Sequence, residues 1–144
     1  MKPKMAVAAS LAFAAMALQP MALATGIAHA DSFQSPSGNI GCYLDSEGST
    51  AVVECEIRDH TFAAPTRPTP CMGGFGNLII LRQGSAPTMP CHSDSALGSG
   101  PPLQYGQRRS LNALSCDSEM SGMTCTDSST GHYFRLSTES YEMH

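Results

Sequence analysis

Lysine and tryptophan are the residues that this sequence most clearly lacks. Its only lysines are Lys2 and Lys4, and it has no tryptophan. Without those two lysines the net charge of −4 becomes −6 for the chain from Asp31 onward, where all 12 acidic residues lie. A mildly acidic surface without lysine does not attract phosphate backbones or anionic headgroups. We therefore expect no nucleic acid and no anionic lipid surface among the partners.

Helix signals are also nearly absent after residue 31. Gly, Pro, Ser and Thr interrupt the chain so often that no amphipathic helix of about ten residues fits between them. The short β-branched and apolar runs between these breaks predict an all-β domain of antiparallel hairpins, either a sheet or barrel-like. Strands are expected at 39–44, 50–58, 77–82, 103–105, 114–118, 123–127 and 132–137. Surface loops are expected at the Pro-rich stretch 63–70 and at the Ser-, Gly- and Pro-rich stretch 93–102.

The first 30 residues have the pattern of a secretory signal peptide. Two lysines precede a continuous apolar run at 5–18, and Ala-His-Ala at 28–30 fits the small-x-small rule for cleavage. As a helix the run spans about 21 Å, short of the ~30 Å hydrocarbon core of a bilayer. We expect cleavage before Asp31 and a single secreted domain over residues 31–144, free outside the cell or in its envelope, with no membrane span.

All six cysteines lie beyond the expected signal peptide. They are Cys42, Cys55, Cys71, Cys91, Cys116 and Cys125. An even count behind an export signal indicates a disulfide framework, which a domain of this size needs for stability. Disulfides leave no thiolate for zinc or for catalysis, and the sequence has no C-x2-C pair. We expect no metal and no cofactor.

The first cysteine pair predicts a hairpin in a defined register. If Cys42 faces Cys55, then Leu44 faces Val53 and Ile40 faces Ile57. Because side chains alternate along strands, these six share one wholly apolar face, and the opposite face is mostly polar. The midpoint falls within Asp-Ser-Glu-Gly-Ser at 45–49, which is turn chemistry. A one-residue slip would bury glutamates, so pattern, turn and disulfide agree.

A second hairpin follows from pairing Cys116 with Cys125. Its inward set includes Ser118 and Asp127, so it is less apolar than the first. Cys71 and Cys91 would then pair and flank the strand at 78–81, which is apolar on both faces and is expected to be central. Pairing in sequence order is favoured over the other possible connectivities, which stay open.

No stretch of the sequence specifies a reaction, and there is no G-x-S-x-G motif. The leading interpretation is a non-catalytic module that binds a protein or an envelope component, with the candidate contact residues Arg67, Phe75, His132 and Tyr133. One alternative is a small hydrolase that uses His132 or His92 with a nearby acid. Another is a protease inhibitor that presents Arg67 between prolines on a stapled loop. The pair Arg108-Arg109 is expected in a solvated loop.

Several segments together resemble a family of small secreted actinobacterial proteins, mycobacterial ones among them, whose function is unknown. The opening F-x-S-P-S-G-N-I-x-C at 33–42 carries the resemblance, and five later segments extend it. These are 53–57, the Pro-rich approach to Cys71, 103–106, 122–125 and 131–137. The chain departs from the family at Tyr133, where the family often has glycine. The resemblance implies secretion, disulfides and a small β-rich domain, and it implies no catalytic residues.

Overall fold

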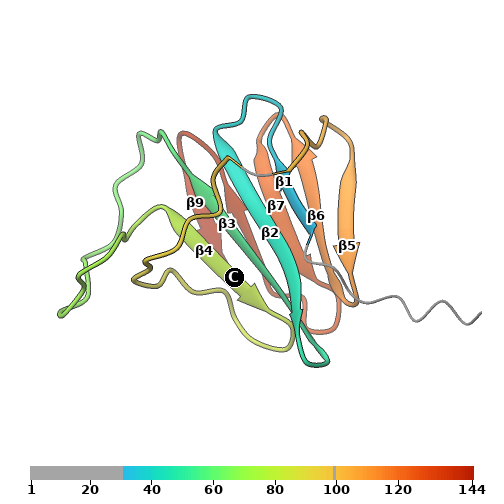
Figure 1. The fold of residues 1–144 in the computed structure, drawn as a ribbon, viewed down its shortest axis with the longest axis horizontal. Coiled ribbons are helices and arrows are strands. Elements are labelled where there is room, and N and C mark those ends of the chain that lie inside the picture. The colour runs from blue at the N-terminus through green and yellow to red at the C-terminus, as the bar shows by residue number, and fades with distance from the viewer. Residues whose placement is uncertain (1–30, 99) are drawn as a thin grey trace, which may run out of the picture.

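The computed structural model describes residues 31–98 and 100–144, which form nine β-strands and no helix. The strands are β1 (Asp31–Gln34), β2 (Ile40–Glu47), β3 (Thr50–Ile57), β4 (Leu78–Arg82), β5 (Arg108–Leu111), β6 (Leu114–Glu119), β7 (Gly122–Asp127), β8 (Tyr133–Leu136) and β9 (Tyr141–Met143). They build two antiparallel sheets, with the orders β1-β2-β3-β4 and β5-β6-β7-β8-β9. Figure 1 shows one sheet lying in front of the other. The predicted all-β hairpin fold is confirmed, as two packed sheets rather than a barrel.

The expected signal peptide lies outside the described residues. Within the described part of the chain, no helix is long and apolar enough to cross a membrane. The first described residue, Asp31, already belongs to β1 and pairs with Leu44 of β2. The folded sandwich therefore includes the residue at which the mature chain is expected to begin.

Three short strands differ from the sequence-based expectation because their own pattern is weak. The strands β1, β5 and β9 have four, four and three residues and lie at sheet edges. The prediction of a solvated loop at Arg108-Arg109 is wrong, since both arginines belong to β5. The Arg108 guanidinium binds Asp117 at 2.7 Å, and that of Arg109 binds Asp31 at 3.2 Å. Pairing with neighbouring strands, rather than local propensity, makes these segments extended.

The expected strand at 103–105 is not a strand in the structure. Leu103 is fully buried, and its backbone N–H donates to the carbonyl of Gln34 at 2.7 Å. The segment then turns away at Tyr105 and Gly106. Leu103 is therefore a core residue that an irregular segment, and not a strand, contributes.

Both central hairpins have the register that the sequence predicts. In the first, Cys42 faces Cys55 and Leu44 faces Val53. In the second, Cys116 faces Cys125. The six residues predicted to share the apolar face of the first hairpin are each at most 5% exposed, which shows that this face is the core face.

The disulfides join Cys42 to Cys55, Cys71 to Cys91 and Cys116 to Cys125, the pairs expected from the sequence. The first and third bridge neighbouring strands, with Cα atoms 4.1 and 4.0 Å apart. They meet in the core, where the sulfurs of Cys55 and Cys125 lie 3.8 Å apart. Neither sulfur carries a proton, so this is a packing contact between the sheets. The grouping of Cys55, Cys116 and Cys125 within 4.8 Å offers no thiolate to a metal.

The prediction that the strand at 78–81 is central is wrong, because β4 is an edge strand. Ile79 and Leu81 face the core and are fully buried. The free edge is covered by a single chain segment, in which Thr88 exchanges two backbone hydrogen bonds with Ile80 at 2.8 and 2.9 Å. A loop therefore pairs with the outer edge of β4, where the sequence suggested a further strand.

The polar face of the first hairpin is partly buried beneath the chain that follows Cys91. Glu56 is only 5% exposed, and its carboxylate accepts hydrogen bonds from the Ser95 hydroxyl at 2.6 Å and the Ala96 N–H at 2.9 Å. A Cβ on Gly41 would lie 2.3 Å from the Ala96 carbonyl oxygen, so only glycine allows this approach. The expectation of a surface loop at 93–102 is therefore incomplete, since its first half packs on the sheet.

Asp127 joins the two sheets at the end where β4 and β7 stop. Its side chain is fully buried, and its carboxylate accepts a hydrogen bond from the N–H of Gly84 at 2.6 Å. The N–H and hydroxyl of Ser129 donate to its other oxygen at 2.8 and 2.6 Å. Burial alone raises the pKa of Asp127, but these hydrogen bonds outweigh burial and hold the pKa below its usual value.

Candidate functional site

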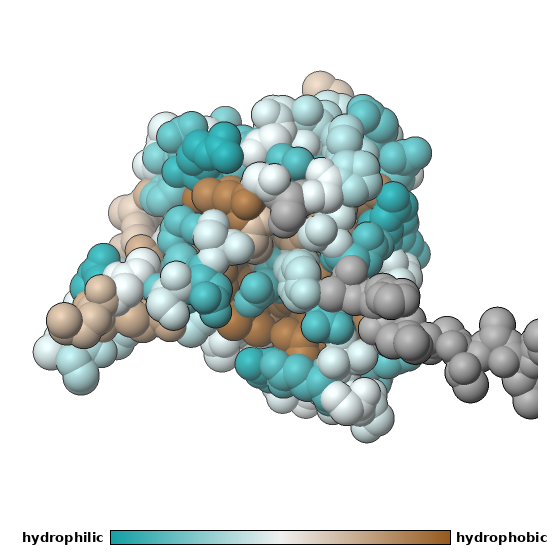
Figure 2. Space-filling view, viewed as in Figure 1, coloured by the Kyte–Doolittle hydropathy of each residue, from teal (hydrophilic) through white to brown (hydrophobic). Residues whose placement is uncertain are grey.

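The connection between β3 and β4 projects from the sandwich as an arm, which we define as residues 58–77. It runs down the left side of Figure 1, and Figure 2 shows it standing clear of the remaining surface. Every residue from 63 to 70 is exposed, and Met72 is 99% exposed. The arm therefore presents prolines and a large apolar side chain to solvent.

A disulfide and one arginine hold the arm in shape. Cys71 is bonded to Cys91, on the far side of β4 in the sequence. The guanidinium of Arg67 folds back and donates to the carbonyl of Gly73 at 2.8 Å and to that of Cys71 at 3.4 Å. Prolines at 65, 68 and 70 further restrict the backbone. The arm is therefore constrained before it meets any partner.

The returning leg of the arm packs against His92. Gly74 and His92 exchange two backbone hydrogen bonds at 2.7 and 3.0 Å. A Cβ on Gly73 would lie 2.1 Å from the His92 carbonyl oxygen, and one on Gly74 would lie 2.8 Å from the imidazole. Glycine at both positions therefore allows this close approach of the two backbones.

His92 is the centre of a hydrogen-bond network at the base of the arm. Its Nδ1 lies 2.9 Å from the Asp94 carbonyl and its Nε2 lies 3.0 Å from Oδ1 of Asn77. The Asn77 amide donates in turn to Glu56 and to the Ile57 carbonyl, both at 3.2 Å. Both imidazole nitrogens therefore face oxygen atoms of the fold, so neither points toward a nucleophile.

We expect His92→Ala to loosen the arm without unfolding the sandwich. Losing two hydrogen bonds raises the population of the opened arm about tenfold. The measurement is the rate of cleavage after Phe75 by chymotrypsin under native conditions, with products identified after reduction. His132→Ala, in the other sheet, is the matched control and should leave that rate unchanged. Equal rates for wild type and His92→Ala would contradict the structural role of His92.

The four residues predicted as a contact surface fall in two places. Arg67 and Phe75 belong to the arm, with Arg67 exposed and Phe75 half-buried. His132 and Tyr133 lie at the start of β8 in the other sheet, both half-buried. The Tyr133 ring stacks on His144 at 4.8 Å, and Nδ1 of His132 lies 3.0 Å from the His144 carbonyl. Arg67 and Phe75 are thus neighbours on one segment, while His132 and Tyr133 belong to a separate one.

A cavity of about 150 Å³ opens at one end of the sandwich, where the β1–β2, β6–β7 and β8–β9 turns meet. We call it the end cavity. Ser and Thr side chains make up much of its wall, with Ile40 and Met123 among its apolar residues and Tyr105 and the 88% exposed Met120 also lining it. Its hydroxyl-bearing Ser and Thr residues are Ser35, Ser37, Ser118, Ser137 and Thr138.

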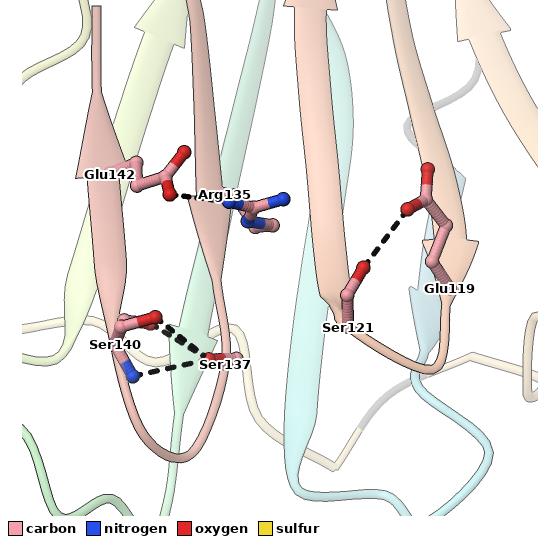
Figure 3. Close-up of polar contacts among 6 residues, drawn as sticks. All are labelled: Glu119, Ser121, Arg135, Ser137, Ser140 and Glu142. Carbon is pink, nitrogen blue, oxygen red and sulfur yellow. Dashed lines mark hydrogen bonds and ion pairs between the residues drawn. The ribbon is translucent and has the colours of Figure 1, made fainter.

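Hydrogen bonds within the turns hold much of this wall in place. Figure 3 shows Ser121 bound to Glu119 and Ser137 bound to Ser140, contacts of 3.0 Å each. An ion pair between Arg135 and Glu142 links β8 to β9 beside them. The wall is therefore largely formed without a ligand.

The arm and the end cavity share a border. The Asn39 side chain, in the cavity wall, bonds both backbone groups of Asp59 at 2.9 and 3.0 Å. The N–H of Thr61 donates to the carbonyl of Thr138, another wall residue, at 2.7 Å. The base of the arm is therefore tied directly to the cavity rim.

Sequence reasoning missed the end cavity because its wall comes from several turns far apart in the chain. Serines are common in this sequence, and nothing in their spacing brings Ser35, Ser118 and Ser137 together. One signal was available at Ser118, a polar residue in a position where the hairpin pattern requires an apolar one. Such local disagreements are expected at functional sites.

Comparison with known proteins gives a family and no activity. No curated protein and no solved structure matches the chain. A family of unknown function, DUF6636, matches residues 12–143, which include every described strand. With this match over nearly its full length, the chain belongs to that family of unknown function.

Proposed function

We propose that the protein is exported and binds a protein or another component of the cell envelope through the arm, without catalysis. Three disulfides in the described chain suit an oxidising compartment. The pattern of the first 30 residues and the resemblance to secreted actinobacterial proteins support export. The role in binding rests on the arm.

The observation that carries the proposal is an exposed arm that is nevertheless constrained. Ordering a flexible loop on binding costs about 0.5–1.5 kcal/mol for each immobilised side chain. The Cys71–Cys91 bond, the Arg67 contacts and the prolines supply much of that order beforehand. Met72 is a large apolar side chain presented at 99% exposure, a suitable anchor for a complementary pocket.

The alternative functions are less well supported by the same geometry. Both nitrogens of His92 are engaged, and Nδ1 of His132 meets a carbonyl. Among the described residues, no histidine hydrogen-bonds a serine hydroxyl, which a hydrolase triad needs. Arg67 folds back onto the arm, whereas an inhibitor must extend that side chain into a protease.

The experiment uses protein recovered from the medium of its native cells and envelope fragments of the same cells. The amino terminus of the recovered protein, read by mass spectrometry, is expected at Asp31. Retention of residues 1–30 would contradict removal of a signal peptide. Cosedimentation then measures binding to the fragments. Met72→Asp should weaken binding about tenfold, because a charge replaces the proposed apolar anchor.

The matched control is Tyr43→Asp, which changes an exposed large side chain outside both the arm and the end cavity. It should bind the fragments as wild type does if the arm is the contact surface. Wild-type affinity in Met72→Asp, or no sedimentation of the wild type at all, would refute the role of the arm.

A further inference from the structure

We propose that the end cavity is a second binding site and that it takes a single pyranose sugar. The site is separate from the role of the arm, and nothing in the argument depends on that role. Four properties support it: a hydroxyl without a partner on a nearly buried serine, the chemistry of the wall, the size of the cavity, and an exposed aromatic ring on its lining.

The unpartnered hydroxyl belongs to Ser118. This residue is 1% exposed and lines the cavity from β6, on the inward face of its hairpin. Among the described residues its hydroxyl has no hydrogen-bond partner, while the other four Ser and Thr hydroxyls of the wall each have one. The buried side-chain atom without a partner in the described chain is Oε1 of Gln83, so the Ser118 oxygen, which also has none, still touches the cavity space. The cavity is where a ligand, or water in its absence, can supply that partner.

The chemistry of the wall favours a neutral ligand rich in hydroxyls. No basic residue of the described segments 31–98 and 100–144 lines the cavity, so a phosphate or carboxylate would find no countercharge there. Its two carboxylates, Glu119 and Glu139, are exposed and therefore attract cations only weakly. A quaternary ammonium ion could not bond the Ser118 hydroxyl. Sugar hydroxyls donate and accept, so they can satisfy both the serines and the carboxylates.

The size and the lining fit one six-membered ring. A cavity of about 150 Å³ is known to accept benzene, and this cavity has the same volume. Tyr105, 54% exposed, presents an aromatic ring to the apolar C–H face of a pyranose. Its position is defined by Ser118 itself, because the neighbouring Gly106 N–H donates to the Ser118 carbonyl at 2.8 Å and the Ser118 N–H donates to Gln107 at 3.0 Å.

The test uses methionine methyl groups as reporters in the folded, disulfide-bonded protein. Protein labelled with ¹³C at the methionine methyls is titrated with methyl glucoside, methyl galactoside, N-acetylglucosamine, tetramethylammonium and inorganic phosphate. We expect at least one pyranose to shift the Met120 and Met123 signals saturably. The Met72 signal, on the arm, should not move, which separates this site from the proposed role of the arm.

Two variants test the assigned contacts. Ser118→Ala should weaken the pyranose about fivefold, the loss of one hydrogen bond, without lowering the unfolding midpoint, because the hydroxyl it removes has no partner in the fold. Tyr105→Ala should weaken it about tenfold, and Tyr43→Ala, which changes another exposed tyrosine outside the cavity, should not. Saturable shifts caused by tetramethylammonium or phosphate but by no pyranose would overturn the proposal. The absence of saturable shifts with every probe, up to its solubility, would overturn it too. Unchanged pyranose affinity in both Ser118→Ala and Tyr105→Ala would also overturn it.

Discussion

Replacing Cys42 and Cys55 together by alanine is expected to lower the free energy of unfolding by about 4 kcal/mol. Closing a loop of this length contributes about 3 kcal/mol by the chain-entropy estimate. Both residues are fully buried against the other sheet, where the sulfur of Cys55 contacts that of Cys125, so their removal also leaves a cavity. Since small domains are stable by about 5–15 kcal/mol, the variant should be close to unfolding at body temperature.

The matched control is Cys71→Ala with Cys91→Ala, measured in the same urea titration followed by circular dichroism. This pair closes the longer loop, with a sequence separation of 20 against 13, so loop entropy alone predicts the larger loss. We expect the smaller loss, because its residues are not in the core and the arm can become mobile in the folded state. A larger loss in the control pair would show that loop length, and not contact in the core, decides how much each disulfide stabilises the protein.

Asp127→Asn is expected to cost about 3 kcal/mol, the second largest effect. The amide has the same shape but carries a donor where Asp127 has only acceptors. Gly84 and Ser129 both present hydrogen-bond donors to the carboxylate oxygens of Asp127. In either orientation, the NH2 group of an asparagine would therefore face a donor. The loss should appear as a lower urea midpoint at neutral pH.

The same substitution predicts a change in the response to acid. Hydrogen bonds hold the pKa of Asp127 below its usual value, so its contribution is fully present above the unfolded-state pKa of about 3.9. That contribution is lost as the pH falls through the lower folded-state pKa. Glu54 acts in the opposite sense, because burial first, and then the charges of Asp94 and Glu56, raise its pKa. Comparing wild type with Asp127→Asn isolates the acid-labile part that belongs to Asp127.

The control for Asp127 is Asp117→Asn on the adjacent strand. Asp117 pairs with Arg108 at the surface, and exposed ion pairs contribute less than about 1 kcal/mol. Equal losses for the two variants, or an acid response unchanged in Asp127→Asn, would show that Asp127 is not the tie between the sheets.

The first hairpin could be predicted in register because its apolar pattern is unbroken around the disulfide. The inward residues from Ile40 to Leu44 and from Val53 to Ile57 are all apolar, and a slip of one residue would bury Glu54 and Glu56 on the core face. The second hairpin was less certain because Ser118 and Asp127 interrupt its apolar face. The structure shows both of them buried, one lining the end cavity and the other binding the opposite sheet.

The arm and the cavity differ in how far the sequence anticipates them. Prolines and Cys71 identified an exposed, stapled loop, and its residues Arg67 and Phe75 were named as contacts. The end cavity has only Ser118 as a local signal, because most of its wall residues come from the turns after β1, β6 and β8 and from the irregular segment at Tyr105. Only packing brings these four segments together.

The sequence by itself determined the all-β class, the registers of both stapled hairpins and a pairing of cysteines that leaves no thiol. These features follow from the alternation of side chains along a strand and from turn chemistry, which act over a few residues. Only the tertiary structure decided that the two core disulfides touch, that β4 is an edge strand covered by Thr88, and that Ser118 opens onto a cavity. Those features depend on which faces of the two sheets meet, and local patterns do not contain that information.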